Sequence, residues 1–298
     1  MRTTGSFFVV IPTYGDLAAT KRCIDSIVSS TNMTVSIIIV DHGANPIPRE
    51  AEWDKSVTLI RADSSNWWTG AINIGIEAAI KSNADSIMLM NDDCRLLPGT
   101  IETLLSCLQE TPTPSIIAPA QTDKDHRTSI LNVTSCFLLG FPTVILPGSG
   151  MFSRDNGSAI RTKLILGARG VVIPASVFGK IGLFNDQALP HYGADHEFYF
   201  RCRRNHIPLF VCAESTVIVD SASGSSAEAP GRLSFGEFWA TLHDRKSHTN
   251  IPDLISLYKL LYPINHLYMI GVVLNLVRYT GKYLLQRGFF YLCSLGRR

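Results

Sequence analysis

The amino-acid sequence predicts an α/β fold: a Rossmann-like, mostly parallel sheet with helices on both faces, followed by an amphipathic helical extension at the C-terminus. Two observations carry this prediction. Between residues 7 and 118, short apolar runs alternate with helical patterns, an order that builds parallel sheets covered by helices. From residue 250 to the end there are six basic residues and one acid, so this part carries +5 and residues 1–249 carry −3. An acidic front and a basic, apolar tail indicate two different roles.

The expected elements follow from the chain in order. Strands are expected where apolar residues run almost without interruption, at 7–11, 35–40, 57–60, 86–90 and 115–118. Helices are expected where apolar residues recur at helical spacing, at 17–29, 70–80 and 98–108. Residues 121–163 predict hairpins and loops, and they are followed by a strand at 164–174, a helix at 195–205 and one or two strands at 209–219. Residues 221–232 are small and polar and predict a mobile loop.

The C-terminal segment has the composition of a surface helix. Residues 264–277 are apolar but too short and too interrupted for a membrane span, which takes about 20 apolar residues. One polar stripe follows at helical spacing, made of Asn275, Arg278, Lys282 and Gln286. A basic amphipathic helix of this kind is typical of a segment lying in a membrane interface. The alternative is a helix packed on the protein's own core.

The cysteines and the N-terminus indicate the compartment. Seven cysteines, an odd number without a C-x-x-C pair, predict neither a disulfide framework nor a zinc site, and a reducing compartment is the simplest interpretation. The apolar run at 7–11 is too short for the core of a signal peptide. We therefore expect a cytoplasmic protein, peripheral on the inner face of the cell membrane. The net charge of +2 gives no argument for a nucleic-acid partner, and none is expected.

Polar residues follow three of the predicted strands directly. They are residues 12–16 (PTYGD), residues 41–43 (DHG) and Asn91-Asp92-Asp93. In a parallel sheet, ligands bind beyond the carboxyl ends of the strands, so these residues share one edge. Crowded carboxylates repel each other unless a cation lies among them, and oxygen ligands suit Mg²⁺ or Mn²⁺. Two alternatives stay open: the Asp-Asp pair begins a turn before Pro98, and Asp41 makes a turn before Gly43.

Several enzyme classes are disfavoured because their motifs are missing. No G-x-G-x-x-G follows the first strand, and no G-x-x-x-x-G-K-[ST], G-x-S-x-G or H-E-x-x-H occurs. A sugar-phosphate nucleotidyltransferase needs a Gly-rich, basic loop after the first strand, and residues 12–16 offer none.

In combination, the motifs resemble glycosyltransferase family 2, whose members have the GT-A fold. Six segments match the family's order: residues 9–14 (VVIPTY), 38–44 (IIVDHGA), 66–75 (NWWTGAINIG), 91–93 (NDD, at the D-x-D position), 182–186 (GLFND) and 194–201 (ADHEFYFR). The resemblance covers residues 7–220. It implies a catalytic domain over residues 1–232, with a nucleotide-binding half at 1–120 and an acceptor and catalytic-base half at 121–232, followed by a helical, membrane-associating extension at 233–298.

The resemblance assigns donor-binding roles to individual residues. It implies that Tyr14 and Asp41 hold the base and ribose of a nucleotide diphosphate sugar, with the Pro12 backbone nearby. Asp93 is then the ligand of Mn²⁺ or Mg²⁺, and Asp92 contacts the metal or the ribose. The first D-x-D position is Asn91, which departs from the family pattern but leaves Asp93 in place.

The resemblance also implies that Asp195 is the catalytic base. The family's preceding Glu is Ala194 here, so Glu197 is a candidate to share or take that role. A late His is often a metal ligand in the family, and Asp220 stands near that place; either Asp220 substitutes for it, or the metal has no late protein ligand. His191 is a candidate for the acceptor pocket, with a loop-capping role as the alternative.

The remaining candidates come from the Gly/Asn-rich stretch. Adjacent residues on a helix point about 100° apart, so one of Trp67 and Trp68 is available to stack on a sugar or base. The alternative is that both cover the sheet. Asn73 is polar within an apolar helix, and we expect it to reach the nucleotide.

Together these features predict an inverting, metal-dependent glycosyltransferase in cell-envelope polysaccharide synthesis. The expected donor is dTDP-rhamnose or a UDP-hexose, and the expected acceptor is a lipid-linked or growing glycan. The alternative is a degenerate, non-catalytic scaffold that binds nucleotide sugars in a polysaccharide synthase complex; the departures at Asn91, Ala194 and Asp220 favour it.

Overall fold

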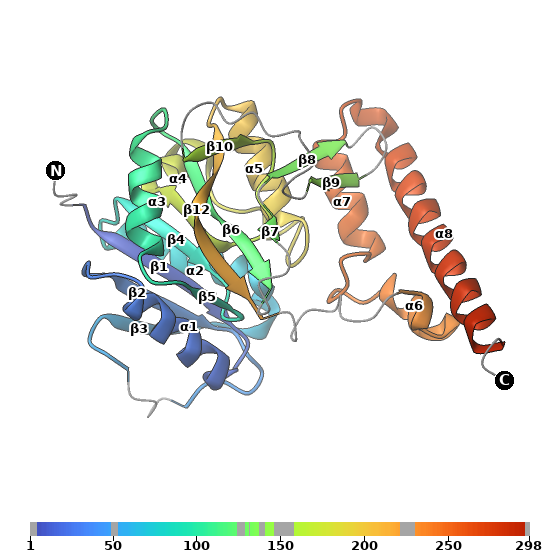
Figure 1. Ribbon diagram of the computed structural model, residues 1–298, viewed down its shortest axis with the longest axis horizontal. Coiled ribbons are helices and arrows are strands. Elements are labelled where there is room, and N and C mark those ends of the chain that lie inside the picture. Colours follow the sequence, from blue (N-terminus) through green and yellow to red (C-terminus); the bar gives the residue numbers. More distant parts are fainter. Residues whose placement is uncertain are drawn as a thin grey trace.

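The computed structural model describes residues 5–48, 53–123, 129–130, 132–136, 141–145, 158–220 and 230–295. It confirms an α/β architecture with a large central sheet and a helical C-terminus (Figure 1). The predicted loop at 221–232 lies mostly outside the described residues, which end at 220 and begin again at 230.

The central sheet has a parallel N-terminal half and a mixed C-terminal half. Its strand order is β10-β12-β6-β11-β4-β1-β2-β3. The parallel strands are β4 (Ser86–Met90), β1 (Phe7–Thr13), β2 (Ser36–Asp41) and β3 (Val57–Arg61). The other half contains β6 (Ile116–Asp123), β10 (Ala159–Thr162), β11 (Arg169–Pro174) and β12 (Leu209–Val219). The strand expected at 164–174 is β11, which is shorter than predicted. It runs antiparallel to both β4 and β6 and therefore reverses the strand direction at the centre of the sheet.

Three short elements add to this sheet. β5 (Cys94–Leu96) pairs antiparallel with β12, and β7 (Ser129–Ile130) pairs antiparallel with β6. A separate hairpin is formed by β8 (Asn132–Cys136) and β9 (Phe141–Ile145). The hairpins expected in residues 121–163 are therefore present, and a single strand occupies residues 209–219.

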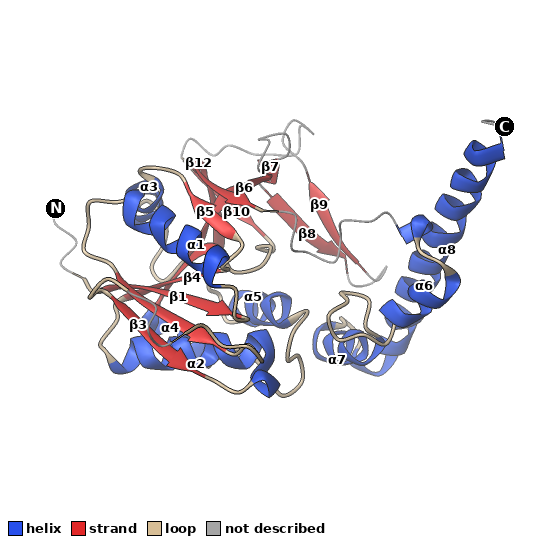
Figure 2. Cartoon of the chain, turned by 90° about the horizontal axis from the view of Figure 1, so that it is seen from below, coloured by secondary structure: helices blue, strands red, loops and turns tan. Residues whose placement is uncertain are grey.

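Helices cover both faces of the sheet (Figure 2). One face carries α1 (Leu17–Ser29) and α3 (Thr100–Gln109); the other carries α2 (Trp67–Lys81), α4 (Ala175–Ile181) and α5 (Ala194–Arg204). The burial pattern of β1 explains this arrangement, because Val9 and Ile11 belong to one core and Val10 to the other. α2 lies very close to the sheet, since a Cβ on Gly75 would stand 2.2 Å from Cγ1 of Val10.

One cysteine pair departs from the expectation of a reducing compartment that the cysteine pattern gave. Cys107 on α3 and Cys212 on β12 are joined in a disulfide, with their Cα atoms 6.3 Å apart. The cause is tertiary: α3 packs on β12 and brings together two residues separated by 105 positions, which no local spacing reveals. The other described cysteine side chains, Cys23, Cys94 and Cys202, are free and buried.

The C-terminal part is helical. It consists of α6 (Phe235–Thr241), α7 (Ile251–Leu261) and α8 (Tyr268–Leu295), with short 3₁₀ turns at Pro230–Arg232 and Asn265–Leu267. α7 lies between α5 and α8, and α8 forms the outer edge of the molecule (Figure 1). Within the described residues, no helix combines the length and the hydropathy that a membrane crossing requires.

Candidate active site

The ends of β1, β2 and β4 meet at one edge of the sheet. Buried Pro12 pairs with Val40 across the β1–β2 ladder, and Thr13 at the end of β1 pairs with Asp41 at the end of β2. On its other side, the Thr13 hydroxyl donates a 2.7 Å hydrogen bond to Oδ2 of Asp92, just beyond β4. The sequence placed these strand ends on one edge, and the register confirms that placement. Thr13 is the residue that ties them together, and the sequence analysis assigned it no role.

Carboxylates crowd together at this edge. The pKa of Asp92 is raised to about 6, chiefly by burial; the negative charges of Asp93 and Asp16 also raise it, and the hydrogen bond from Thr13 lowers it. Carboxylates that disfavour one another's ionisation in this way are stabilised by a cation. The geometry therefore supports the interpretation of residues 91–93 as more than the start of a turn.

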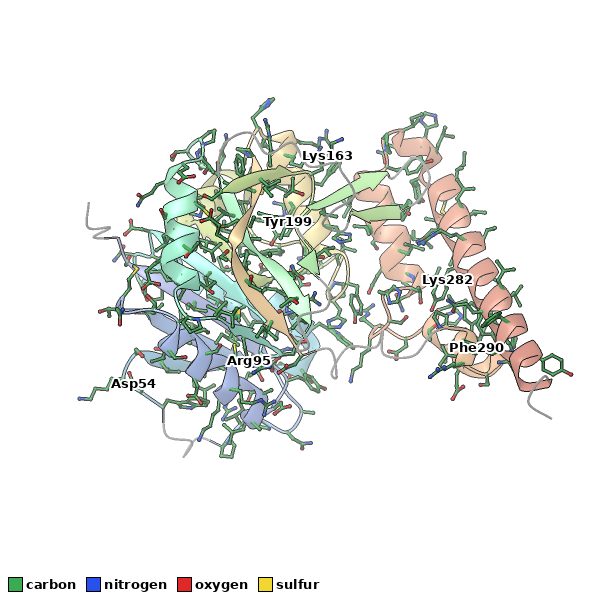
Figure 3. The ribbon with its side chains drawn as sticks, in the orientation of Figure 1. Asp54, Arg95, Lys163, Tyr199, Lys282 and Phe290 are labelled. Atoms are coloured by element: carbon green, nitrogen blue, oxygen red, sulfur yellow. A yellow bond between two sulfur atoms is a disulfide. The ribbon has the colours of Figure 1, made fainter. Side chains whose placement is uncertain are left out.

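Asp93 and Asp220 are neighbours across the β5–β12 pairing. The backbone N–H of Asp220 donates to the carbonyl oxygen of Asp93 at 2.9 Å. The Asp220 carboxylate forms an ion pair with Arg95 on β5, at 3.0 Å. Figure 3 labels Arg95. The structure therefore brings together the backbones of the two residues predicted as metal ligands, and it adds a guanidinium beside the Asp220 carboxylate.

This set of oxygen donors fits Mg²⁺ or Mn²⁺ bound jointly with a substrate. Among the described residues, no three His, Cys, Asp or Glu side chains form a group able to hold a metal ion by themselves. Mg²⁺ is usually held by one or two carboxylates together with substrate phosphates, rather than by an all-protein cage. Asp93 and Asp220 match that pattern in number and type.

Asp41 is enclosed rather than presented to a ligand. Its side chain has no solvent exposure, and its carboxylate pairs with Arg61. It also accepts hydrogen bonds from the backbone N–H groups of Gly43 at 3.0 Å and Ile47 at 2.6 Å. Asp41 thus holds the turn that follows β2, as the turn-forming alternative expected, and its contact with a nucleotide stays a prediction.

The start of α2 is anchored to the same edge. Nε1 of Trp68 donates to Oδ1 of Asn91 at 3.1 Å, and the Trp68 ring lies edge-on to Phe184. Asn73 is buried and exchanges two hydrogen bonds with the Phe184 backbone, at 2.9 and 3.0 Å. Both ends of its amide are used in joining α2 to the segment before α5, so its expected contact with a nucleotide remains untested.

Asp195 lies in the first turn of α5 and faces the same edge. Its Oδ2 accepts a 2.9 Å hydrogen bond from the backbone N–H of Gly167, and the Tyr199 hydroxyl donates to the carbonyl of Gly167 at 3.1 Å. Gly167 lies just before β11, whose first residue Arg169 pairs with Met90 at the end of β4. The chain therefore holds Asp195 at the end of the strand that leads into Asn91-Asp92-Asp93.

Glu197 is committed to an internal ion pair. Its Oε1 accepts from Nε of Arg201 at 2.8 Å, and its Oε2 accepts from Nη2 of the same guanidinium at 2.9 Å. Arg201 also donates to the carbonyl oxygens of Ile181 and Leu183. A carboxylate with both oxygens bound to a guanidinium is a poor proton acceptor, so the geometry favours Asp195 over Glu197 as the base.

We expect Arg201→Met to lower the free energy of unfolding by about 2–4 kcal/mol, because it leaves the Glu197 charge buried and unpaired. Urea unfolding followed by circular dichroism measures the loss. Arg22→Met, at an exposed position on α1, is the matched control and is expected to change stability by less than about 0.5 kcal/mol. Equal stability of the two variants would contradict the structural role of Arg201.

An aromatic and imidazole cluster covers the edge next to Asp195. The His191 ring lies 5.7 Å from Trp67 and 4.5 Å from Tyr192. The pKa of His191 is lowered to about 4, chiefly by burial and then by its interactions with His42 and Lys246. The imidazole is therefore neutral at neutral pH. Burial also lowers the pKa of His42, against the opposing effect of Asp41. His191 lies where a pocket-shaping residue is expected, although its acceptor contact stays a prediction.

Two cations from the C-terminal extension reach back to this cluster. Nζ of Lys246 stands 5.3 Å from the ring centre of Tyr14, and the Arg245 guanidinium 5.6 Å from that of Trp67. Tyr14 is half exposed and also contacts the His42 ring. Arg245 and Lys246 were not predicted, because no local pattern links residues 245–246 to the start of the chain. His42 was predicted to lie at this edge only as one of residues 41–43, without a role of its own.

Comparisons with known proteins agree with this geometry. Residues 8–146 match the family model described as glycosyl transferase family 2. No curated protein matches the sequence. The crystal structure of GalNAc-T7 with UDP, GalNAc and Mn2+ superposes with a TM-score of 0.61 and 12% identity, over 93% of this chain and 58% of that one. The crystal structure of S. aureus TarS 1-349 superposes with a TM-score of 0.53 and 12% identity, over 96% of this chain and 91% of that one.

At this identity the two superpositions show the fold alone, and the chain spans little more than half of the GalNAc-T7 structure. They confirm the predicted GT-A arrangement of sheet and helices. The family match covers β1, β2 and β4 and the polar residues at their ends, from Pro12 to Asp93. Residues 8–146 therefore match the model of glycosyl transferase family 2, and the fold around those residues is GT-A.

Proposed function

We propose that the protein is an inverting, metal-dependent glycosyltransferase that moves a sugar from a nucleotide diphosphate donor to a lipid-linked or growing glycan in cell-envelope polysaccharide synthesis. One observation carries the proposal: the Gly167–Asp195 hydrogen bond and the Arg169–Met90 pairing hold a carboxylate in the first turn of α5 beside the strand end that bears Asp92 and Asp93. These carboxylates lie at one edge of the sheet, and we assign Asp195 to the base and Asp92 and Asp93 to binding the diphosphate.

The proposed reaction uses Asp195 as the base. One of its oxygens is held by Gly167, and among the described residues its other oxygen has no hydrogen-bond partner. That oxygen takes the proton from the acceptor hydroxyl as the hydroxyl oxygen attacks the anomeric carbon. The bond from that carbon to the diphosphate breaks, and the nucleoside diphosphate leaves with the electron pair. Attack from the face opposite the leaving group inverts the anomeric centre.

The leaving diphosphate carries the charge that the site must stabilise. Asp93, with Asp220, would hold Mn²⁺ or Mg²⁺, which supplies Lewis-acid stabilisation of that charge when bound. The GalNAc-T7 structure contains UDP and Mn2+, which supports the choice of metal and of a UDP donor; dTDP-rhamnose is the other donor proposed. Lys246 and Arg245 are further cations on this side of the sheet, and we assign them to the donor phosphates.

The function is tested by incubating the purified protein with nucleotide sugars, including dTDP-rhamnose and UDP-hexoses, in the presence of Mn²⁺ or Mg²⁺. Release of free nucleoside diphosphate, by transfer or by hydrolysis, is the expected result. Tight nucleotide binding without any release would instead support the non-catalytic scaffold. Neither binding nor release from any donor would overturn both interpretations.

We further propose that the C-terminal helices hold the enzyme on the inner face of the cell membrane. α8 buries its Gln286 side, where Oε1 accepts a hydrogen bond from the Gly231 N–H at 3.2 Å. Its opposite side exposes large apolar residues: Ile270 (49%), Val273 (52%), Leu274 (41%), Val277 (64%), Leu284 (57%) and Leu285 (78%). Packing on the protein's own core, the alternative to a membrane interface, occurs on the buried side of α8 through Val272 and Tyr283.

The charges around this apolar face fit an anionic lipid surface. α8 contains no acidic residue. At about 100° per residue, Arg278 and Lys282 lie along one flank of the exposed apolar face and Arg287 along the other. A helix of this pattern lies in the interface with its apolar side among the acyl chains and its cations at the headgroups. Membrane attachment would bring the site to a lipid-linked acceptor.

We expect the double variant Val277→Asp/Leu285→Asp to lose binding to anionic vesicles by at least about tenfold, because two charges would have to enter the acyl region. Flotation with vesicles of phosphatidylglycerol and phosphatidylcholine measures the bound fraction. Val28→Asp, at a 53% exposed position on α1, is the matched control and should float like the wild type. Equal flotation of the double variant would refute attachment through α8.

A further inference from the structure

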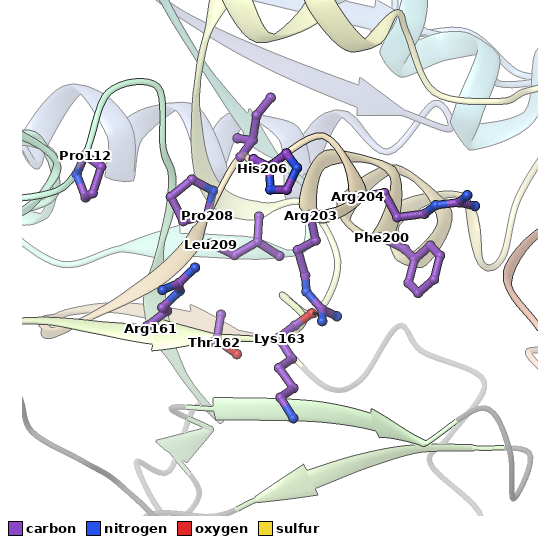
Figure 4. A pocket seen from close by; sticks show the side chains of 11 residues that line it. Pro112, Arg161, Thr162, Lys163, Phe200, Arg203, Arg204, His206, Pro208 and Leu209 are labelled. Atoms are coloured by element: carbon purple, nitrogen blue, oxygen red, sulfur yellow. Dashed lines mark hydrogen bonds between the residues drawn. The ribbon is translucent and has the colours of Figure 1, made fainter. Parts of the chain in front are cut away.

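A second site-like feature lies at the far end of α5 from Asp195. It is a cavity of about 830 Å³ (Figure 4). Its walls come from β10 and the residue that follows it, and from the end of α5 with the turn leading to β12. In Figure 3, Lys163 of this cavity is far from Arg95, which marks the candidate active site. The cavity is therefore not part of the donor site.

Among the described residues that line the cavity, several are basic and none is acidic. The basic residues are Arg161, Lys163, Arg203, Arg204 and His206. Burial lowers the pKa of Arg203, and the positive charge of Arg161 lowers it further. The Arg203 guanidinium donates to the carbonyl of Lys163 at 2.9 Å, so it crosses from the helix wall to the strand wall. None of these side chains forms an ion pair with an acidic residue that the structure describes.

Helix electrostatics explain only half of this cluster. Cations near a helix C-terminus are favoured by the helix dipole, which accounts for Arg203 and Arg204 in the last turn of α5. Arg161 and Lys163 come from the opposite wall and gain nothing from that dipole. Their positive charges repel those of Arg203 and Arg204. Arg203 is half-buried and the other four basic residues are exposed. Like charges held close together repel each other, and an anion lying between them would offset that repulsion.

We propose that this cavity is a binding site for a phosphate-bearing ligand, either a phosphate monoester or a phosphodiester. Guanidinium groups bind phosphate oxygens through paired, charge-assisted hydrogen bonds, and Arg161 and Arg203 face the cavity from its two walls. Arg203 is eight residues after Asp195 on α5, about 12 Å along the helix axis. Phosphate bound here would leave the donor site open, so both sites can be occupied together.

The test is phosphate binding by the full-length protein, measured as the rise in Tm with sodium phosphate at constant ionic strength and by calorimetric titration. We expect the wild type to be stabilised by phosphate. Arg161→Gln/Arg203→Gln should weaken phosphate binding at least about tenfold. In phosphate-free buffer that variant should unfold at the same Tm as the wild type or a higher one, because a repulsion has been removed. A purely structural role for the two arginines predicts a lower Tm.

Two controls separate this site from other sources of phosphate binding. Lys21→Gln/Arg22→Gln removes two exposed charges from α1, and Lys246→Gln removes a cation from the donor site; both should retain the phosphate effect. Glycerol 3-phosphate and phosphatidylglycerol vesicles are further probes. If inorganic phosphate or glycerol 3-phosphate binds and the double variant weakens that binding, the ligand is a soluble or glycan-borne phosphate. If only the vesicles bind in this Arg161- and Arg203-dependent way, the ligand is a lipid headgroup. If no probe distinguishes the double variant from the wild type, the proposal is overturned.

Discussion

Replacing Asp195 by Asn is expected to lower kcat for sugar transfer by a factor of about 10²–10⁴, the range that a positioned general base contributes. The substitution is nearly isosteric. Its amide oxygen can still accept the hydrogen bond from the Gly167 N–H that Oδ2 of Asp195 accepts at 2.9 Å. The fold and the donor site should therefore survive, while the proton acceptor is lost. Single-turnover transfer assays measure the chemical step, and nucleotide titration checks that donor binding is unchanged.

Glu197→Gln is the matched control, because it neutralises the other carboxylate of the same helix turn. Glu197 binds Arg201 through both oxygens, so this variant should lose stability and keep its chemical step within about tenfold. If Glu197→Gln instead folds but does not transfer sugar, and Asp195→Asn stays active, then Glu197 is the base. The two variants therefore decide between the candidates that the sequence left open.

The elements predicted best are those whose signal is local. The helix at 17–29 and the strand at 86–90 occur with the predicted bounds, because α1 shows a clear apolar face and β4 is a continuous buried run. The direction of β11 was not predictable, since its apolar run fits either orientation, and only its insertion between β4 and β6 fixes it as antiparallel. Sequence periodicity reports burial, whereas strand direction depends on the connections made elsewhere in the chain.

The same division applies to the candidate site. Residues next to strand ends were found from the sequence, because a parallel sheet places such ends together whatever the details of packing. The sequence did not show which of the acidic residues at the site are occupied by an ion pair. The sequence treats Asp195 and Glu197 alike as acidic residues of one helix turn, and only the position of Arg201 engages one of them. The contact of Lys246 with the Tyr14 ring joins residues 232 positions apart in the sequence, and no spacing rule connects them.

Asp93→Ala is expected to weaken Mn²⁺-dependent binding of the preferred nucleoside diphosphate by at least about 100-fold, since metal coordination of a diphosphate contributes several kcal/mol. Titrating UDP, dTDP and GDP with and without Mn²⁺ measures the effect and identifies the base of the donor. Asp25→Ala, at an exposed position on α1, removes one acidic charge elsewhere and should bind like the wild type. This control separates loss of a ligand from a change in net charge.

Asp220→Asn tests how far the metal site extends beyond Asp93. Asp220 pairs with Arg95 at 3.0 Å and is joined to Asp93 through the backbone, so its carboxylate must turn from the guanidinium to reach a metal. If it does, Asp220→Asn should weaken Mn²⁺-dependent binding about tenfold, as removal of a weaker ligand would. An unchanged affinity would mean that Asp220, at the end of β12, is not a metal ligand, and would assign it to positioning Arg95. If Asp93→Ala itself binds nucleotide with full Mn²⁺ dependence, the metal site proposed at the end of β4 is wrong.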